Sequence, residues 1–375
     1  MKFAPPFTYN QTKKTTVYKE LEMADKYLQI AYKMESDLRR MRADGIIKLP
    51  TEESFCEKYS CSRQTIRSAL KVLVEKGLII KKRGSGSYIT DDSARLNNTI
   101  VFITSDKFEY VRPEFISGIK SVLKENKFDL VCYGTDCSFA KERKALEEAL
   151  SLLPAAILIE PSSNIIPNPN IALIEDIRRK GIPVVYLYSS YKETKDCLCI
   201  EEDDYQGAVM LVSHLKEKGH NKTCCIFRCD DSRGLARYKG YIEACKEYGI
   251  TSDEHNAFFI TGRDRNKIVK GDNKILQTFI DEIDSDCTAV ICHNDEIAFR
   301  LIQLLEKTGI SVPKDLAVVS FENSYYSSGP ANITSLGHSD KELVNKTTEA
   351  VISAIEHKSF SPEPVKWKLH VRNSG

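Results

Sequence analysis

The chain has 375 residues, 42% of them hydrophobic, and a formal net charge of +1, so it is long enough for two or three packed domains. Residues 25–90 carry an excess of six positive charges, whereas residues 91–375 carry an excess of seven negative charges. A basic module on an acidic body indicates a protein that contacts a polyanion with one end only.

The sequence argues against export, membrane insertion and metal binding. The first ten residues lack an apolar core, and no run of about 18 apolar residues occurs, so we expect a cytoplasmic protein without contact to a membrane. The twelve cysteines are then expected to be thiols. Cys224 and Cys225 fall on a predicted buried strand, and paired zinc-type motifs are missing, so neither a metal nor a cofactor is expected.

The first structured segment is predicted at residues 25–90, after a polar tail at 1–24 that is expected to be disordered. A short helix starts near Pro50 and ends near Tyr59. The next helix places Arg63 and Arg67 on one face and an apolar stripe on the other. A glycine-tipped basic hairpin follows at residues 79–89. This order predicts a winged helix-turn-helix that binds DNA.

The same residues resemble the DNA-binding domain of GntR-family regulators. The resemblance runs from Tyr27 to Thr90 and rests on the motifs Pro50-Thr51-Glu52, Ser62-Arg63-x-Thr65-x-Arg67-x-Ala69-Leu70, Gly77-Leu78 and Gly84-x-Gly86. It implies that Arg63 and Arg67 contact guanines or phosphates, since the arginine fork matches the acceptors of guanine.

Five further residues are candidate contacts to double-stranded DNA. Gln64 lies between the two arginines and can bind adenine or phosphate. Glu52 either contacts a base or simply favours the dipole of its helix. The expected backbone or minor-groove contacts are Lys26, Arg83 and Gly84, although Lys26 is equally consistent with a solvated lysine.

A polar linker is predicted at residues 91–98, and from Thr99 apolar segments of strand length alternate with helical segments. The predicted strands are Ile100–Thr104, Leu130–Tyr133, Ala155–Ile159, Pro183–Tyr188, Thr223–Phe227, Phe258–Ile260, Ala289–Cys292 and Leu316–Phe321. The predicted helices include Glu114–Glu125, Lys141–Leu153, Gln206–Lys218, Leu235–Tyr248 and Glu296–Lys307. This pattern predicts an α/β domain at 99–375 with two doubly wound lobes of parallel sheet and a ligand cleft where strand ends meet.

Residues 99–372 resemble the effector domain of the LacI/GalR family, which has the fold of periplasmic sugar-binding proteins. The matching motifs include Asp203-Asp204, Arg237-x-x-Gly240-Tyr241, the run Asn294–Ala298, and Ser320-Phe321-Glu322-Asn323. A GntR-type reader joined to such a sensor resembles the arabinose-responsive repressors of Gram-positive bacteria. In the last motif Glu322 replaces the usual aspartate, which leaves the identity of the sugar open.

The candidate effector residues follow predicted strands or come from this resemblance. Arg237 aligns with an arginine that grips sugar hydroxyls in related repressors; its alternative role is a surface charge. We expect Asp295 to cap the following helix, which leaves Asn294 to face the cleft together with Glu322. The other candidate residues at the cleft are Tyr110, Glu160 and Tyr188.

The sequence therefore predicts a homodimeric DNA-binding regulator, and the resemblance implies a repressor that a small sugar, in the first place L-arabinose, releases from operator DNA. The known nucleophile, phosphate-loop and dinucleotide-binding motifs do not occur, so no catalytic residue is assigned. The alternatives are the same architecture with another sugar, a purine or an amino acid as ligand, or a regulator whose ligand acts as a co-repressor.

Overall fold

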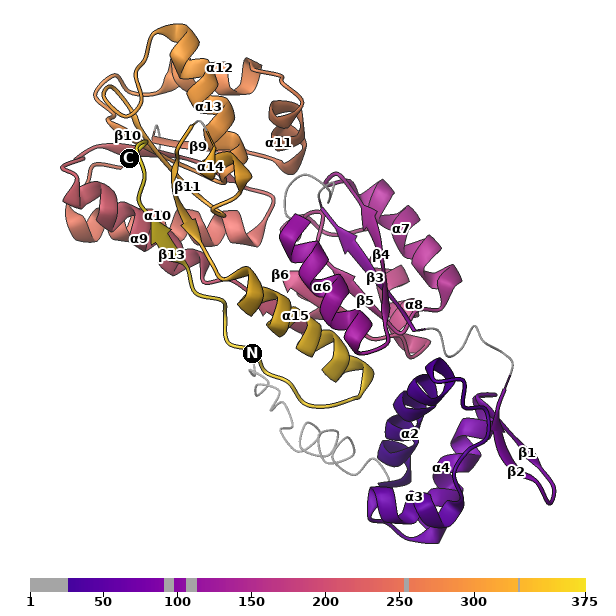
Figure 1. Cartoon of the computed structure of the whole chain (residues 1–375). Helices are drawn as coiled ribbons and strands as arrows, with labels where there is room; N and C mark the ends of the chain where they lie inside the picture. The colour runs from indigo at the N-terminus through magenta and orange to yellow at the C-terminus, as the bar shows by residue number, and fades with distance from the viewer. Residues whose placement is uncertain (1–25, 91–97, 106–112, 253–255, 330) are drawn as a thin grey trace, which may run out of the picture. The chain divides into compact units, whose positions relative to one another are not determined.

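The computed structural model describes residues 26–90, 98–105, 113–252, 256–329 and 331–375 (Figure 1). These residues fall into two compact units that divide between Asn97 and Asn98. The predicted tail at 1–24 lies outside the described residues, as does the predicted linker except for Asn98.

The first unit is a winged helix-turn-helix, as predicted. It comprises α2 (Lys26–Ala43), α3 (Glu52–Tyr59), α4 (Arg63–Glu75) and the antiparallel hairpin β1 (Ile79–Lys82) and β2 (Gly86–Ile89). The side chains of Thr51 and Ser62 cap α3 and α4, which fixes where the two helices begin. Ser60, with a φ of 48°, turns the chain between them. The core includes Met34, Leu38, Phe55, Ile66, Leu70, Leu73 and Ile89.

The second unit begins with a lobe built on five parallel strands in the order β4-β3-β5-β6-β7. The strands are β3 (Thr99–Thr104), β4 (Asp129–Gly134), β5 (Ala156–Ile159), β6 (Val184–Tyr188) and β7 (Leu198–Glu201). Four helices cover the sheet, and a short 3₁₀ turn follows β6 at Lys192–Thr194. The helices are α6 (Pro113–Glu125), α7 (Phe139–Leu152), α8 (Ile171–Arg179) and α15 (Asp340–Ile355).

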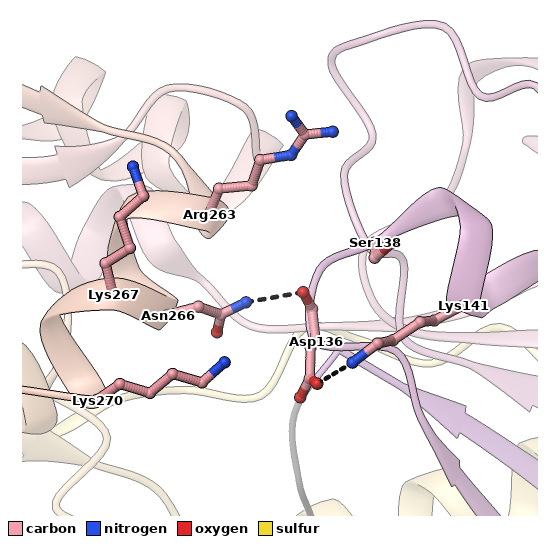
Figure 2. A pocket seen from close by; sticks show the side chains of 7 residues that line it. All are labelled: Asp136, Ser138, Lys141, Arg263, Asn266, Lys267 and Lys270. Atoms are coloured by element: carbon pink, nitrogen blue, oxygen red, sulfur yellow. Dashed lines mark hydrogen bonds and ion pairs between the residues drawn. The ribbon is translucent and has the colours of Figure 1, made fainter.

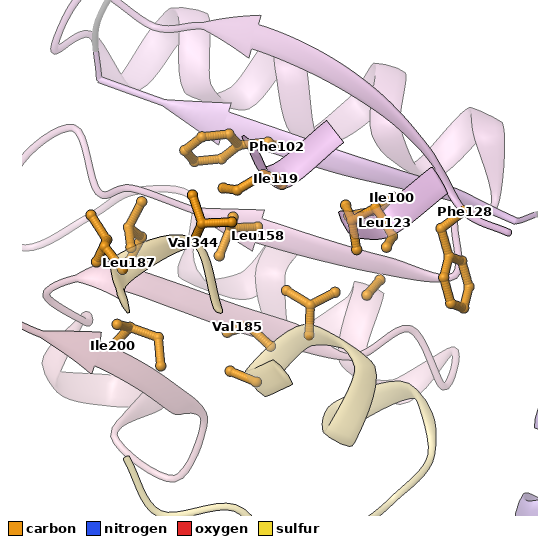
Figure 3. Packing of buried hydrophobic residues seen from close by; sticks show 14 of the residues in the cluster. Ile100, Phe102, Ile119, Leu123, Phe128, Leu158, Val185, Leu187, Ile200 and Val344 are labelled. Atoms are coloured by element: carbon orange, nitrogen blue, oxygen red, sulfur yellow. The ribbon is translucent and has the colours of Figure 1, made fainter. Parts of the chain in front are cut away.

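Helices cover both faces of this sheet because successive strand residues point to opposite sides. Ile100 and Phe102 of β3 pack under α6 and α15, whereas Val101 and Ile103 pack under α7 and α8. Figure 3 shows Val344 of α15 among the residues of the first of these two clusters. A helix from the C-terminal region therefore completes this lobe.

The other lobe has six strands in the order β13-β12-β11-β10-β8-β9, and all neighbours are parallel except β12 and β13. The strands are β8 (Thr223–Arg228), β9 (Ala257–Ile260), β10 (Ala289–Cys292), β11 (Ala317–Phe321), β12 (Thr334–Gly337) and β13 (Lys368–His370). The helices are α9 (Asp204–Glu217), α10 (Ser232–Tyr248), α11 (Gly262–Val269), α12 (Lys274–Glu282), α13 (Asp295–Thr308) and α14 (Tyr325–Ser328).

Here α9 and α10 cover one face of the sheet, and α11, α12 and α13 cover the other. The first two helices approach each other closely at Gly240. A Cβ atom at this position would lie only 2.3 Å from the carbonyl oxygen of Tyr205. Gly240 is therefore required by the contact between two helices and not by a turn.

The chain crosses between the two lobes three times. The first crossing lies between β7 and α9, the second between β12 and α15, and the third between α15 and β13. Each predicted strand is present with ends shifted by at most one or two residues, but β7, β12 and β13 were not predicted. The cleft is thus bounded by strand ends of both sheets and by three crossing segments.

Candidate functional site

The first half of α4 presents polar side chains to solvent. The side chains of Arg63 and Arg67 are 66% and 59% exposed, and Gln64 is exposed as well. Ile66 and Leu70 lie on the opposite face in the core. The helix therefore has the geometry of a recognition helix that rests on a small core.

Glu52 connects to both arginines across the turn. Its Oε2 atom lies 3.0 Å from Nε of Arg67 and 3.5 Å from Nε of Arg63. The sequence offered base contact or the helix dipole as roles for Glu52, and this bridging position is a third one. A carboxylate here holds two otherwise mobile guanidinium groups in one place.

The hairpin of β1 and β2 carries further positive charge. Arg83 and Gly84 are exposed at its tip, where Gly84 has a φ of +74° that favours glycine. Nζ of Lys82 lies 4.9 Å from the centre of the Tyr88 ring. Lys26 is the first residue of α2, but its side chain lies outside the described residues.

In the second unit the carboxyl ends of the strands carry the candidate effector residues. Glu160 follows β5, and its Oε2 atom accepts hydrogen bonds from Oγ1 of Thr104 and, at 3.2 Å, from the backbone N–H of Ser105. Tyr188 ends β6 and is buried. In the other lobe, Asn294 precedes α13 and Glu322 follows β11. Tyr110 lies outside the described residues.

The expectation that Asp295 caps α13 was wrong. Asn294 caps α13, because its Oδ1 accepts a hydrogen bond from the backbone N–H of Ile297 at 3.1 Å. Its Nδ2 donates to Oε2 of Glu322 at 3.5 Å, so the residue both caps the helix and contacts Glu322.

Asp295 is instead fully buried and accepts hydrogen bonds from three serines. Ser335 Oγ lies at 2.6 Å, the Ser324 hydroxyl at 2.9 Å, and the Ser320 hydroxyl is a further donor. Burial raises the pKa of Asp295 to about 6, although these hydrogen bonds act in the opposite direction. The residue ties the ends of β11 and β12 to the start of α13.

Arg237 is completely buried, so the alternative of a surface charge was wrong. Its Nε donates to Oδ1 of Asp204 at 2.7 Å, and Nη1 donates to the backbone carbonyl of His293. The guanidinium lies 4.0 Å from the ring centre of Phe321. The guanidinium of Arg237 is therefore bound by other residues of the protein and is not exposed to solvent.

Arg233, one helical turn before Arg237, was not predicted and joins both lobes. Its guanidinium lies 4.5 Å from the ring centre of Tyr188 in the first lobe, and Nη2 donates to Glu202 at 2.5 Å. Burial lowers the pKa of Arg233, but the nearby carboxylates outweigh it and raise that pKa well above its ordinary value. These carboxylates belong to Glu202, Asp204, Asp231 and Glu322. In the sequence, the only indication that Arg233 belongs to the site is its position shortly after β8.

The lobes touch directly beside these residues. Asn164 accepts a hydrogen bond from the backbone N–H of Ser232 at 2.8 Å, and its Nδ2 donates to the hydroxyl of the same serine at 2.7 Å. Ser163 donates to the backbone carbonyl of Asp230 at 2.5 Å. The two lobes are therefore in direct contact beside Arg233.

Several buried polar atoms near the strand ends have no hydrogen-bond partner among the described residues. They are Nε of Arg233, Nη2 of Arg237 and Nδ1 of His293, although both arginines also form ion pairs with Asp204. Burial, with the positive charges of Arg237 and other nearby arginines, lowers the pKa of His293 well below its usual value. Nε of Arg233 and Nη2 of Arg237 lie 3.4 and 2.7 Å from the carboxylate of Asp204. Of the three atoms, only Nδ1 of the neutral His293 imidazole is therefore without a partner in the described part of the chain.

Comparison with known proteins identifies both units. Residues 26–89 match the model of bacterial regulatory proteins of the gntR family, and residues 212–374 match that of the periplasmic binding protein-like domain. The chain is 30% identical over 325 residues to the arabinose metabolism transcriptional repressor of Halalkalibacterium halodurans, covering 84% of this chain and 86% of that protein. It is 28% identical to the repressor of the same name from Geobacillus stearothermophilus, over 93% and 97% of the two chains.

Solved structures agree on the fold of the second unit. A periplasmic binding protein/LacI transcriptional regulator from Alkaliphilus metalliredigens, complexed with D-xylulofuranose, has a TM-score of 0.62 at 21% identity. It covers 74% of this chain and 99% of its own. The complex of the transcriptional regulator CelR with cellobiose has a TM-score of 0.63 at 18% identity, over 84% and 92% of the chains.

A winged-helix reader followed by a two-lobed α/β sensor defines a one-component transcriptional regulator. The chain belongs to the family of GntR-type regulators with a periplasmic-binding-protein-like domain that includes the arabinose metabolism transcriptional repressors. These relatives are repressors and not enzymes, in agreement with the sequence prediction.

None of the helices in the described ranges is long and apolar enough to cross a membrane. Within the same ranges, no three side chains of histidine, cysteine, aspartate or glutamate come together as a possible metal site.

Proposed function

We propose that the protein represses transcription by binding operator DNA through residues 26–90, and that a small sugar between the lobes of the second unit releases it. The exposed arginines on a capped helix support the first part. The charged and amide side chains of Arg233, Asn294 and Glu322, which lie where the strand ends of the second unit meet, support the second. The proposed place of action is the cytoplasm.

For DNA, the proposed contacts are Arg63, Gln64 and Arg67 in the major groove and the hairpin tip with Arg83 and Gly84 at the backbone. Glu52 is proposed to orient the arginines. Replacing Arg63 or Arg67 with alanine should cost about 1–3 kcal/mol at the operator. Lys71→Ala is the matched control, because Lys71 is equally exposed on the same helix and pairs with Glu75. Binding is measured by fluorescence anisotropy on selected DNA.

For the effector, we propose L-arabinose, with Tyr188, Arg233, Asn294 and Glu322 as direct contacts. The names of the two repressors and the polar composition of the cleft support a sugar. Glu160 extends this set at the neighbouring strand end. Arg237 is proposed to act from below, where it fixes Asp204 and the His293 carbonyl.

Calorimetry with the full chain tests this assignment. L-arabinose should bind, and Glu322→Gln should weaken binding by about tenfold, since a charged acceptor for sugar hydroxyls is lost. Glu306→Gln, on the exposed side of α13, should have no effect. If a purine or an amino acid binds and no pentose does, the effector is that alternative ligand and not a sugar.

We further propose that the protein acts as a homodimer and that sugar lowers its affinity for DNA. A single winged helix contacts few base pairs, and a two-fold dimer matches a palindromic operator. Because coupling between two ligands is reciprocal, DNA should weaken sugar binding by the same factor. Sedimentation and DNA titration with and without sugar test both parts; tighter DNA binding in sugar would indicate a co-repressor.

A further inference from the structure

A cavity in the second unit lies between the two lobes and is lined mainly by positive side chains. It measures about 250 Å³. Its lining residues are Asp136, Ser138 and Lys141 from the first lobe and Arg263, Asn266, Lys267 and Lys270 from α11 of the other (Figure 2). Four cationic side chains thus face one acidic side chain.

The walls of this cavity are fixed by contacts between the lobes. Asn266 donates from Nδ2 to the backbone carbonyl of Asp136 at 2.7 Å (Figure 2). At the start of α11, a Cβ atom on Gly262 would lie 2.9 Å from Sγ of Cys137, so the two lobes are in close contact there. The cavity is therefore formed by residues of both lobes that are held in contact with each other.

The positive charge of the cavity is only partly compensated. Lys141 pairs with Asp136, and Lys267 lies 3.3 Å from Oδ1 of Asp264. Among the described residues, no acidic partner is found within ion-pair distance of Arg263 or Lys270, and both are exposed. A dianion in the cavity would gain two cationic side chains, those of Arg263 in α11 and of Lys270 directly after it.

The cavity lies where a bound ligand would have a large effect on the separation of the two lobes. Its walls follow β4 and β9, which are the edge strands of their sheets. The three crossing segments join the sheets at β7, which is the opposite edge of its sheet, and at β12 and β13, which are the last two strands on the opposite side of theirs. Lobes that hinge about the crossings separate most at the far edge, so a ligand bridging this point favours the closed state.

We propose that this cavity binds a phosphorylated small molecule, such as a sugar phosphate, as a second effector distinct from the sugar in the cleft. Lysine and arginine together suit a phosphate dianion, which accepts hydrogen bonds from several directions. The volume is slightly below the about 300–1,000 Å³ typical of drug-sized ligands, which fits a compact anion. Through closure of the lobes, the anion raises the affinity for the sugar in the cleft.

Calorimetry with the full chain tests the proposal, using a hexose 6-phosphate, inorganic phosphate and the unphosphorylated hexose as separate probes. The hexose phosphate should bind and the free hexose should not bind here. The double variant Arg263→Glu/Lys270→Glu should weaken phosphate binding by about tenfold or more. Lys274→Glu is the matched control, because Lys274 is exposed on the next helix and does not line the cavity.

Three other outcomes would contradict the proposal, and they can be told apart. Absence of heat with both phosphate probes up to millimolar concentration overturns it, as does an equal loss in Lys274→Glu. Loss of DNA affinity in the double variant, without phosphate binding to the wild type, would assign the charges to DNA instead. Binding of L-arabinose is measured in the same variants. Retained arabinose binding shows that the second unit of a variant is folded, and absence of arabinose binding in the wild type contradicts the proposed effector and not the phosphate site.

Discussion

Nε2 of His338 lies 2.8 Å from Oε1 of Glu202, and the two residues belong to different crossing segments between the lobes. The other carboxylate oxygen of Glu202 accepts a hydrogen bond from Arg233. Trp367, in the third crossing segment, places its ring 5.3 Å from that of His338. One buried carboxylate thus links the crossing segments to the effector cleft.

Replacing Glu202 with alanine should destabilise the sensor by about 3–5 kcal/mol, because Arg233 would remain as a buried charge with reduced compensation. The free energy of unfolding from urea titration measures this effect. Glu201→Ala is the matched control, since Glu201 is the adjacent residue and is exposed. Similar losses in both variants would contradict a special role for the buried carboxylate.

Stability should fall as the pH decreases below about 6.5, because the pKa of His293 is well below that value in the fold. The unfolded chain then binds a proton that the folded chain does not, so the contribution is complete above this pH and is lost below it. The expected slope approaches about 1.4 kcal/mol per pH unit.

The slope is measured as a difference between variants, since Asp295 acts with opposite sign. Its raised pKa of about 6 means that the folded chain binds more protons from about pH 4 to 6. His293→Gln should remove the histidine contribution, whereas His357→Gln, at an exposed position, should retain it. Unfolding by urea at several pH values measures each slope; parallel curves for wild type and His293→Gln would refute the assignment.

Gly240→Ala should destabilise the second unit despite the better helix propensity of alanine. The added methyl group meets the Tyr205 carbonyl at 2.3 Å, and relief requires α9 and α10 to separate. Overpacking costs about 1–3 kcal/mol, against a gain of up to about 1 kcal/mol in propensity. Thermal unfolding measures the net loss, and Lys239→Ala, on the exposed neighbouring position, is the control.

Glu52→Gln should raise affinity for random DNA and lower the ratio of specific to random binding. The change removes one negative charge beside the DNA contacts and releases Arg63 and Arg67 from their common partner. The discrimination lost is at most the about 1–3 kcal/mol of one bidentate base contact. Glu53→Gln, exposed in the same turn of α3, is the control. An unchanged ratio would leave Glu52 with only its role at the helix start.

The sequence was most informative where local chemistry decides the structure. The caps Thr51 and Ser62, the apolar stripe of α4 and the continuous apolar strands depend on neighbouring residues, so their elements were predicted nearly in full. β7 (Leu198–Glu201), β12 (Thr334–Gly337) and β13 (Lys368–His370) have only three or four residues each. Nothing local marks them as strands.

Side-chain roles at the cleft were harder to predict because they depend on which strand ends meet. Asn294 and Asp295 are both residue types that cap helices well. Asp295 does not act as the cap because its carboxylate accepts hydrogen bonds from serines of β11 and β12. Arg233 becomes important through Tyr188 of the first lobe and Glu202 of the first crossing segment. No spacing in the sequence brings these three residues together.

The three crossings determine how the protein can be recombined with its relatives. Residues 98–201 fold together with α15, so a segment taken from one end of the chain cannot transplant the first lobe. Exchange of the DNA-binding unit needs a single junction near Asn98, whereas exchange of the second lobe needs three junctions, one in each crossing segment, and exchange of the first lobe alone needs a fourth near Asn98. Chimeras with a new operator specificity are therefore accessible by one fusion, and chimeras with a new cleft wall require matched crossings.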